Sequence, residues 1–212
     1  MMADEPETPT PAVIVPEEPP AFEISVTLFI DNSGSMTDEG GIASGTDFQK
    51  RLVSELSRSN QTDDSRILIR SMLFSDLPLW QQQSAVSVNQ YEIEEAPVGK
   101  FSNFGAALKI ALTEASQHSK EGRRVWIWIG DGYVTDEWFT QAELLRTDAA
   151  FQDIERYSVF PEGSIHRTAL QWFAGTEDRV VPASAAERIF HDLTIGHSPA
   201  VSESDGWDDD VF

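Results

Sequence analysis

The sequence predicts an α/β domain with a Rossmann-like, doubly wound and mostly parallel central sheet that carries helices on both faces. The first observation is a pair of segments that are apolar on both faces, residues 23–30 (EISVTLFI) and 124–130 (RVWIWIG). Such runs are typical of central strands in a parallel sheet. The second observation is that helical patterns separate the strand-like runs, which favours right-handed βαβ units. The length of 212 residues suits one such domain with tails.

The remaining elements follow from periodicity and from turn residues. Alternation over residues 66–74 predicts a strand with one exposed face or an edge position. We expect further strands at 86–91, 154–160 and 180–181. Apolar residues at helical spacing predict helices at 46–59, 104–117, 137–151, 164–174 and 184–193.

Composition divides the chain into three parts. Residues 1–22 are rich in proline and glutamate and show no apolar face, so we expect a disordered or extended arm. Residues 23–197 form the predicted folded domain. Residues 198–212 read as an acidic, disordered tail that includes Trp207 and Phe212. The tail either aids solubility or acts as a short docking motif.

The charge of the chain restricts its partners. The formal net charge is -21, and the two ends, 1–23 and 196–212, contain no Lys or Arg. Such a surface repels nucleic acid and anionic membranes, so we expect neither as a partner. The chain has no cysteine, and its first residues lack the basic and apolar regions of a secretory signal. We therefore expect a cytoplasmic protein, with no obvious signal for homo-oligomers.

Two predicted central strands each end at an aspartate, Asp31 and Asp131. Ligands of open α/β sheets bind at the carboxyl ends of the strands, where two neighbouring carboxylates would repel each other unless a cation lay between them. The turn after the first strand adds the hydroxyls of Ser33 and Ser35. Oxygen donors of this kind suit Mg²⁺ or Mn²⁺, whereas zinc would favour cysteine or clustered histidine.

These residues resemble the metal-ion-dependent adhesion site (MIDAS) of von Willebrand factor A (VWA) domains, whose pattern is Asp-x-Ser-x-Ser, a later Thr and a later Asp after an apolar strand. The resemblance implies that Ser33 and Ser35 bind the ion directly, Asp31 through the loop or a water, and Asp131 mostly through water. It places Ser102 at the position of the family's Thr. Because Ser replaces Thr, the neighbouring Asn103 stays open as an alternative ligand.

The segment 130–136 (GDGYVTD), followed by Trp138, and the stretch around 190–198 are similar to bacterial tellurium-resistance-associated VWA proteins. That branch implies a stress-response role with protein kinase or phosphatase components as partners. For the domain itself, the resemblance implies a non-enzymatic module that binds an Asp or Glu of another protein at its metal.

Other interpretations of the same residues stay open. The turn 31–35 can be a simple Asx-type turn, and Ser102 can be a helix N-cap. A metal-dependent phosphatase or a phosphoryl-acceptor domain would use Asp31 as nucleophile, but such phosphatases place an Asp where this chain has Ser33. A scaffold whose metal site has decayed is the third alternative.

Aromatic residues add two expectations. Trp126 and Trp128 alternate with aliphatic residues, so we expect helices to cover them. Trp80, Tyr133 and Trp138 fall near the carboxyl edge, where they form an exposed rim for a partner or simply pack in loops. Asp136 precedes the helix predicted to begin at residue 137 and is expected to be its N-cap. For the histidines, surface or capping roles are expected, and these are His118, His166, His191 and His197.

Overall fold

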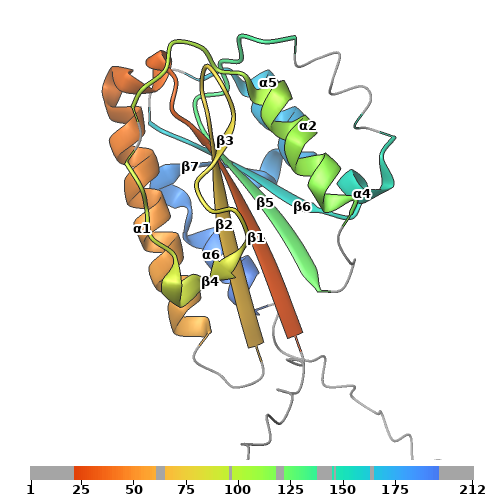
Figure 1. The fold of residues 1–212 in the computed structure, drawn as a ribbon. Helices are drawn as coiled ribbons and strands as arrows, with labels where there is room; N and C mark the ends of the chain where they lie inside the picture. Colours follow the sequence, from red (N-terminus) through yellow and green to blue (C-terminus); the bar gives the residue numbers. More distant parts are fainter. Residues whose placement is uncertain are drawn as a thin grey trace, which may run out of the picture.

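The computed structural model describes residues 22–60, 65–95, 97–117, 122–137, 145, 147–162 and 165–195. Its sheet has the strand order β3-β2-β1-β5-β6-β7, with β4 also paired to β2 (Figure 1). The parallel strands are β1 (Phe22–Asp31), β2 (Ser65–Phe74), β5 (Arg123–Ile129), β6 (Glu155–Phe160) and β7 (Val180–Pro182). The short strands β3 (Leu79–Trp80) and β4 (Val86–Ser87) run antiparallel to β2. The predicted, mostly parallel sheet is confirmed.

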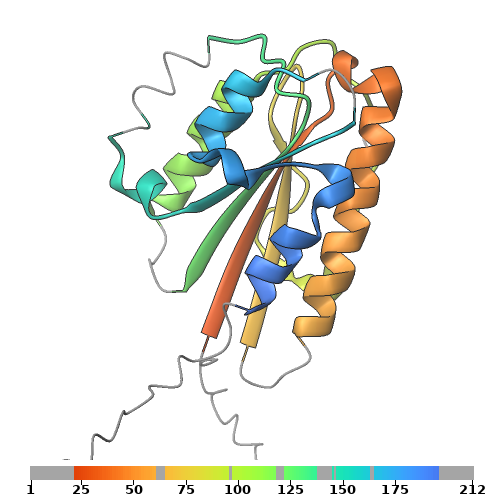
Figure 2. The same cartoon turned by 180° about the vertical axis from the view of Figure 1, so that it is seen from behind.

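Helices cover both faces of this sheet (Figures 1 and 2). One face carries α1 (Gly41–Ser59) and α6 (Glu187–Ile195), and the other carries α2 (Phe104–Ala115), α4 (Ala149–Gln152) and α5 (Arg167–Ala174). Short 3-10 helices complete the described part, namely η1 (Gly34–Gly40), η2 (Val88–Gln90), η3 (Glu177–Arg179) and η4 (Ala183–Ala185). None of the helices in the described part of the chain is both long and apolar enough to cross a membrane.

The sheet separates two apolar cores, and β1 contributes to both. Ile24, Val26 and Leu28 face α1 and α6, while Phe29 faces α2 and α5. Because side chains alternate along a strand, only a strand that is apolar on both faces can fill two cores. As predicted, Trp126 and Trp128 are buried, and Trp128 stacks on Phe104 of α2 with 3.6 Å between ring centroids.

Several predicted boundaries are wrong. Helix α1 begins at Gly41 instead of residue 46, so it includes two glycines that a propensity argument excludes. At Gly45 the helix packs closely on the sheet, since a Cβ there would lie 3.1 Å from the Ile129 side chain. The helix predicted at 137–151 is confirmed only in part: Leu145 and Ala149–Gln152 (α4) are helical, whereas Glu137, Thr147 and Asp148 are not. Residues 138–144 and 146 lie outside the described residues.

Strand β2 is not at the edge of the sheet, since β3 and β4 pair with its outer side. The alternative prediction of one more exposed face is confirmed in the first half of β2, where Arg66 is exposed and Leu68 and Arg70 are half-buried, while Ile67 and Ile69 are fully buried. The predicted arm lies outside the described residues except for Phe22, the first residue of β1, and the predicted tail lies outside them entirely.

Candidate metal centre

Asp31 and Asp131 lie together at the carboxyl edge of the sheet. Asp31 is the last residue of β1, and Asp131 follows β5, the strand that pairs in parallel with β1. Both are buried, with 1% and 7% of their surface exposed. Gly130 allows this close approach, because a Cβ on it would lie 2.8 Å from the Asp31 Cβ. The predicted pairing of the two aspartates is confirmed.

The turn after Asp31 folds back on the carboxylate. The backbone N–H of Ser33 donates to Asp31 Oδ1 at 3.0 Å, and the hydroxyl oxygens of Ser33 and Ser35 are 3.1 Å apart. The chain then enters η1, where the Met36 N–H donates to the Ser33 carbonyl at 3.1 Å. This Asx-type turn therefore gathers two hydroxyls beside a buried carboxylate instead of only capping the strand.

Ser102, and not Asn103, faces this cluster. Ser102 is fully buried, and its hydroxyl donates to Asp31 Oδ2 at 2.9 Å. Asn103 occupies the N-cap position of α2 without capping it, and its side-chain amide donates to the carbonyl of Asp76 at 2.6 Å. The alternative role of Ser102 as the N-cap is thus wrong, and the neighbouring Asn103 points its amide to a different loop.

The loop after Asp131 holds the Ser102 segment in place. Thr135 and Ser102 are doubly joined, since the Ser102 N–H donates to Thr135 Oγ1 at 2.8 Å and the Thr135 N–H donates to the Ser102 carbonyl at 3.0 Å. Asp136 Oδ2 accepts from the Ala106 N–H at 3.0 Å. Asp136 therefore caps α2, and its expected role as the cap of a helix beginning at residue 137 is wrong.

Thr135 and Asp136 are positioning residues that the sequence argument missed. Both belong to the segment 130–136, from which the sequence argument took a family resemblance and an N-cap role for Asp136, but no contact with the Ser102 segment. The only sign of this role in the sequence is a hydroxyl and a carboxylate that follow a few residues after the aspartate at the end of a strand. Their partners are reached by tertiary contacts over 33 and 30 positions, which the sequence does not reveal.

Burial dominates the electrostatics of the cluster. It raises the pKa of Asp31 from 3.8 to about 7; the charge of Asp131 adds to the rise, and hydrogen bonds from Ser33 and Ser102 oppose it. A buried carboxylate next to a second one is costly unless a cation compensates them. The donor set consists of carboxylate and hydroxyl oxygens and fits a hard divalent cation.

A metal at this site would depend on the serine hydroxyls. The described residues contain no group of three or more His, Cys, Asp or Glu side chains suited to a metal. The residues that would hold the ion are Asp31, Ser33, Ser35, Ser102 and Asp131.

Exposed apolar side chains lie on the loops that adjoin the cluster. Val98 precedes Gly99, whose N–H donates to the Asn32 carbonyl at 3.0 Å. Phe101 and Lys100 donate their backbone N–H groups to Asp76 Oδ1, each at 3.0 Å. We call the four exposed residues on these loops the apolar rim, and they are Leu77, Val98, Phe101 and Tyr133.

Of the predicted aromatic rim, only Tyr133 is confirmed. It is 48% exposed, and its ring lies 4.8 Å from the ring of His166. Trp80 is half-buried, because its indole N–H donates to Glu114 at 2.8 Å and Arg70 lies over its ring. Trp138 lies outside the described residues, as do His118 and His197. His166 and His191 are exposed, as expected for surface histidines.

No protein-family model and no curated protein sequence matches the chain. Solved structures do match over 82% of it. Proximal thread matrix protein 1 from the mussel byssus has a TM-score of 0.56 at 17% identity, with 45% of its own length covered. The ArnB paralog VWA2 from Sulfolobus acidocaldarius has a TM-score of 0.54 at 18% identity, with 44% of its length covered. The pilus adhesin SpaC from Lactobacillus rhamnosus GG has a TM-score of 0.60 at 10% identity, with 30% of its length covered.

These likenesses show a VWA fold, as the sequence predicts, and at such identities they show the fold alone. The chain spans less than half of the length of each of these three structures. One structure of the mussel protein has a zinc-occupied MIDAS motif, so this fold holds a divalent metal in at least one neighbour.

Proposed function

We propose that this chain is a non-enzymatic protein-binding module that takes up Mg²⁺ or Mn²⁺ and binds an Asp or Glu side chain of another protein there. The observation that carries the proposal is the hydrogen-bonded cluster around buried Asp31, which Ser33 and Ser102 contact at 3.0 and 2.9 Å. A bound ion would supply the positive charge that the two aspartates lack and that a partner carboxylate can contact.

The apolar rim supports a protein as the partner. Exposed apolar and aromatic side chains around a polar centre exclude water from a contact and are typical of protein interfaces. The loops of the rim are joined by hydrogen bonds to Asn32 and Asp131, so a partner on the rim would lie next to the metal ligands.

The non-enzymatic assignment is part of the proposal. Phosphatases that use an Asp at this strand end need a second acid two residues on, and this chain has Ser33 there. The enzyme alternative predicts Mg²⁺-dependent hydrolysis of a generic aryl phosphate that is lost in Asp31→Asn. We expect no such activity.

The cellular context is a finer proposal. It rests on the likeness of residues 130–136 and Trp138 to tellurium-resistance-associated VWA proteins. We propose a cytoplasmic stress-response role, with kinase or phosphatase components as candidate partners.

The test is retention of partners on the immobilised full chain. With Mg²⁺ present, we expect the wild type to retain specific proteins that are released by EDTA and are absent with Asp31→Asn. The matched control is Asp47→Asn, an exposed aspartate on α1, which should behave as the wild type. Retention of the same proteins in EDTA and by Asp31→Asn would refute the proposal.

A further inference from the structure

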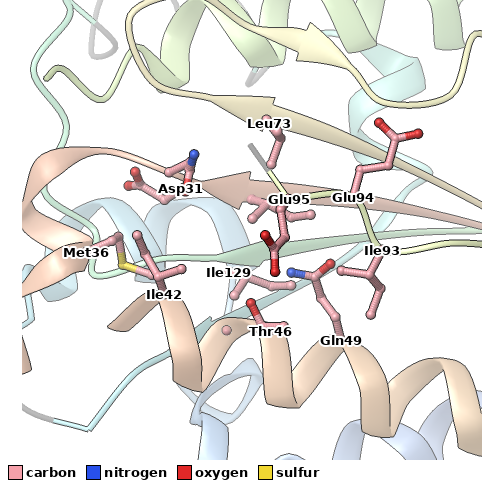
Figure 3. A pocket seen from close by; sticks show the side chains of 13 residues that line it. Asp31, Met36, Ile42, Thr46, Gln49, Leu73, Ile93, Glu94, Glu95 and Ile129 are labelled. Atoms are coloured by element: carbon pink, nitrogen blue, oxygen red, sulfur yellow. The ribbon is translucent and has the colours of Figure 1, made fainter. Parts of the chain in front are cut away.

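A cavity of about 270 Å³ lies beside the candidate metal centre, between the first half of α1, the carboxyl ends of β1 and β5, and residues 93–95 (Figure 3). Asp31 and Asn32 line it at the end next to the metal centre. Its other walls are mainly aliphatic, formed by Ile30, Ile42, Leu73, Ile93 and Ile129. The cavity is therefore a mostly apolar space that opens near the place where a partner carboxylate would bind.

Gln49 is the polar group inside this cavity. The residue is only 3% exposed, yet its side-chain oxygen Oε1 is buried and has no hydrogen-bond partner. In Figure 3 its amide rises from α1 into the cavity, with the nitrogen on the side of Glu95 and the oxygen on the side of Ile93. An unpaired buried acceptor destabilises the folded chain, so a hydrogen-bond donor from a ligand would remove a standing penalty.

The charge of the lining selects the ligand. The charged residues that line the cavity are all acidic, namely Asp31, Glu94 and Glu95. Glu94 and Glu95 are exposed, and the whole chain has a net charge of -21. An anion would be repelled, whereas a cation with an apolar stem would match both the carboxylates and the aliphatic walls.

We propose that this cavity binds a lysine side chain of the protein partner. The four-carbon stem would lie against the isoleucines, and the ammonium group would donate to Gln49 Oε1. The negative charges of the exposed Glu94 and Glu95 side chains would attract the ammonium group to the cavity. The inference rests on the proposed function, since it gives the same partner a lysine close to the acidic residue that binds at the metal.

The test follows the side-chain amide resonances of Gln49 by NMR in the full-length chain, with EDTA present. The probe is N-acetyl-lysine amide, and the reference is N-acetyl-norleucine amide, which has the stem without the ammonium group. We expect the lysine probe to shift the Gln49 resonances with a dissociation constant on the order of 1 mM, as for a small ligand. The norleucine probe should bind at least about tenfold more weakly.

Substitutions of exposed residues test the proposal without disturbing the folded core. Replacing both exposed carboxylates of the cavity, Glu94→Gln with Glu95→Gln, should lower the affinity for the lysine probe about three- to tenfold. Glu92→Gln, an exposed neighbour that does not line the cavity, should leave its affinity unchanged. Equal binding of the two probes, no shift at Gln49, or an unchanged affinity in the double variant would overturn the proposal.

Two further arms separate the possible outcomes. If the polyamine spermidine shifts Gln49 while the lysine probe does not, the cavity is a small-molecule site and the proposal is wrong. Because the titration is run in EDTA, its failure does not depend on the metal. Loss of Mg²⁺ binding with the lysine titration intact would contradict only the proposed function.

Discussion

At the amino end of the sheet, Glu155 of β6 lies against Arg123 of β5, whereas at the carboxyl end Asp31 lies beside a second carboxylate. The Arg123–Glu155 pair has two short contacts, Nε to Oε1 at 2.6 Å and Nη2 to Oε2 at 2.8 Å. The Arg123 guanidinium also donates to the carbonyl of Asp192 at 3.1 Å. The hydrogen bond from Arg123 holds the pKa of Glu155 below its usual value, while burial raises that of Asp31 to about 7.

The two ends therefore use carboxylates for different purposes. A carboxylate that already has its cation stabilises the folded chain and has little to offer a ligand. A buried carboxylate beside another one lowers the stability of the folded chain, and that cost is recovered only when a cation binds. A local feature that destabilises the fold, such as this pair of carboxylates, is a common sign of a functional site.

The largest expected effect is the response of stability to the ion. Mg²⁺ at one hundred times its dissociation constant should raise the free energy of unfolding of the wild type by about 2.7 kcal/mol. Asp31→Asn should gain almost nothing, and Glu155→Gln should gain as much as the wild type. Urea unfolding with and without Mg²⁺ measures this increase for the wild type and the two variants. An equal increase in Asp31→Asn would show that the ion does not bind at the carboxyl end of the sheet.

The second effect appears without any ion. In EDTA at a pH above 7, Asp31→Asn should raise the free energy of unfolding by about 1–3 kcal/mol, because it removes a buried charge. The same carboxylate-to-amide change in Glu155→Gln should lower it by about 1–2 kcal/mol, since Arg123 loses a charged partner. Changes of the same sign at both ends would show that the comparison is mistaken.

The pH dependence should also have opposite signs. The Asp31 pKa is raised from 3.8 to about 7, so its contribution to stability is fully present below about pH 4 and is lost as the pH rises through 7. Glu155 has a lowered pKa, so its contribution is present above its ordinary value of 4.5 and is lost as the pH falls.

The measurement is the difference in unfolding free energy between wild type and Asp31→Asn in EDTA. It should grow in favour of the variant from about pH 4 to 7 and level off above 7, and saturating Mg²⁺ should remove the trend. A difference that is flat over this range in EDTA would contradict the assigned pKa.

A smaller effect concerns the loop that holds Ser102. Thr135→Val removes the hydroxyl that accepts from the Ser102 N–H at 2.8 Å, and should weaken Mg²⁺ binding about tenfold, as is usual for groups that orient metal ligands. Thr113→Val on α2 is the matched control and should leave the affinity unchanged. Unaltered affinity in Thr135→Val would show that the loop does not position the site.

The sequence was sufficient for the parts of the site that follow directly from strands. Asp31 and Asp131 were predictable because each follows a strand that is apolar on both faces, and parallel strands end at one edge. The turn to Ser33 and Ser35 was predictable because it is local. The fold followed from the same alternation of strands and helices.

Contacts between distant segments were beyond the sequence argument. Whether Ser102 or Asn103 faces Asp31 depends on the direction of a loop that Thr135 fixes from thirty-three positions away. The close packing of Gly45 of α1 on Ile129 is also a contact between distant segments, and glycine in the sequence instead suggested that the helix begins later. Residue type alone gave no indication that Gln49 would be buried with an unpaired oxygen, because glutamine on a helix is usually exposed.

The central claim is that the buried cluster around Asp31 binds a divalent cation. Calorimetric titration of Mn²⁺ and of Mg²⁺ into the full-length chain above pH 7 tests it most directly. The account predicts one ion bound per wild-type chain and no measurable binding by Asp31→Asn. No binding by the wild type, or equal binding by the variant, would contradict it.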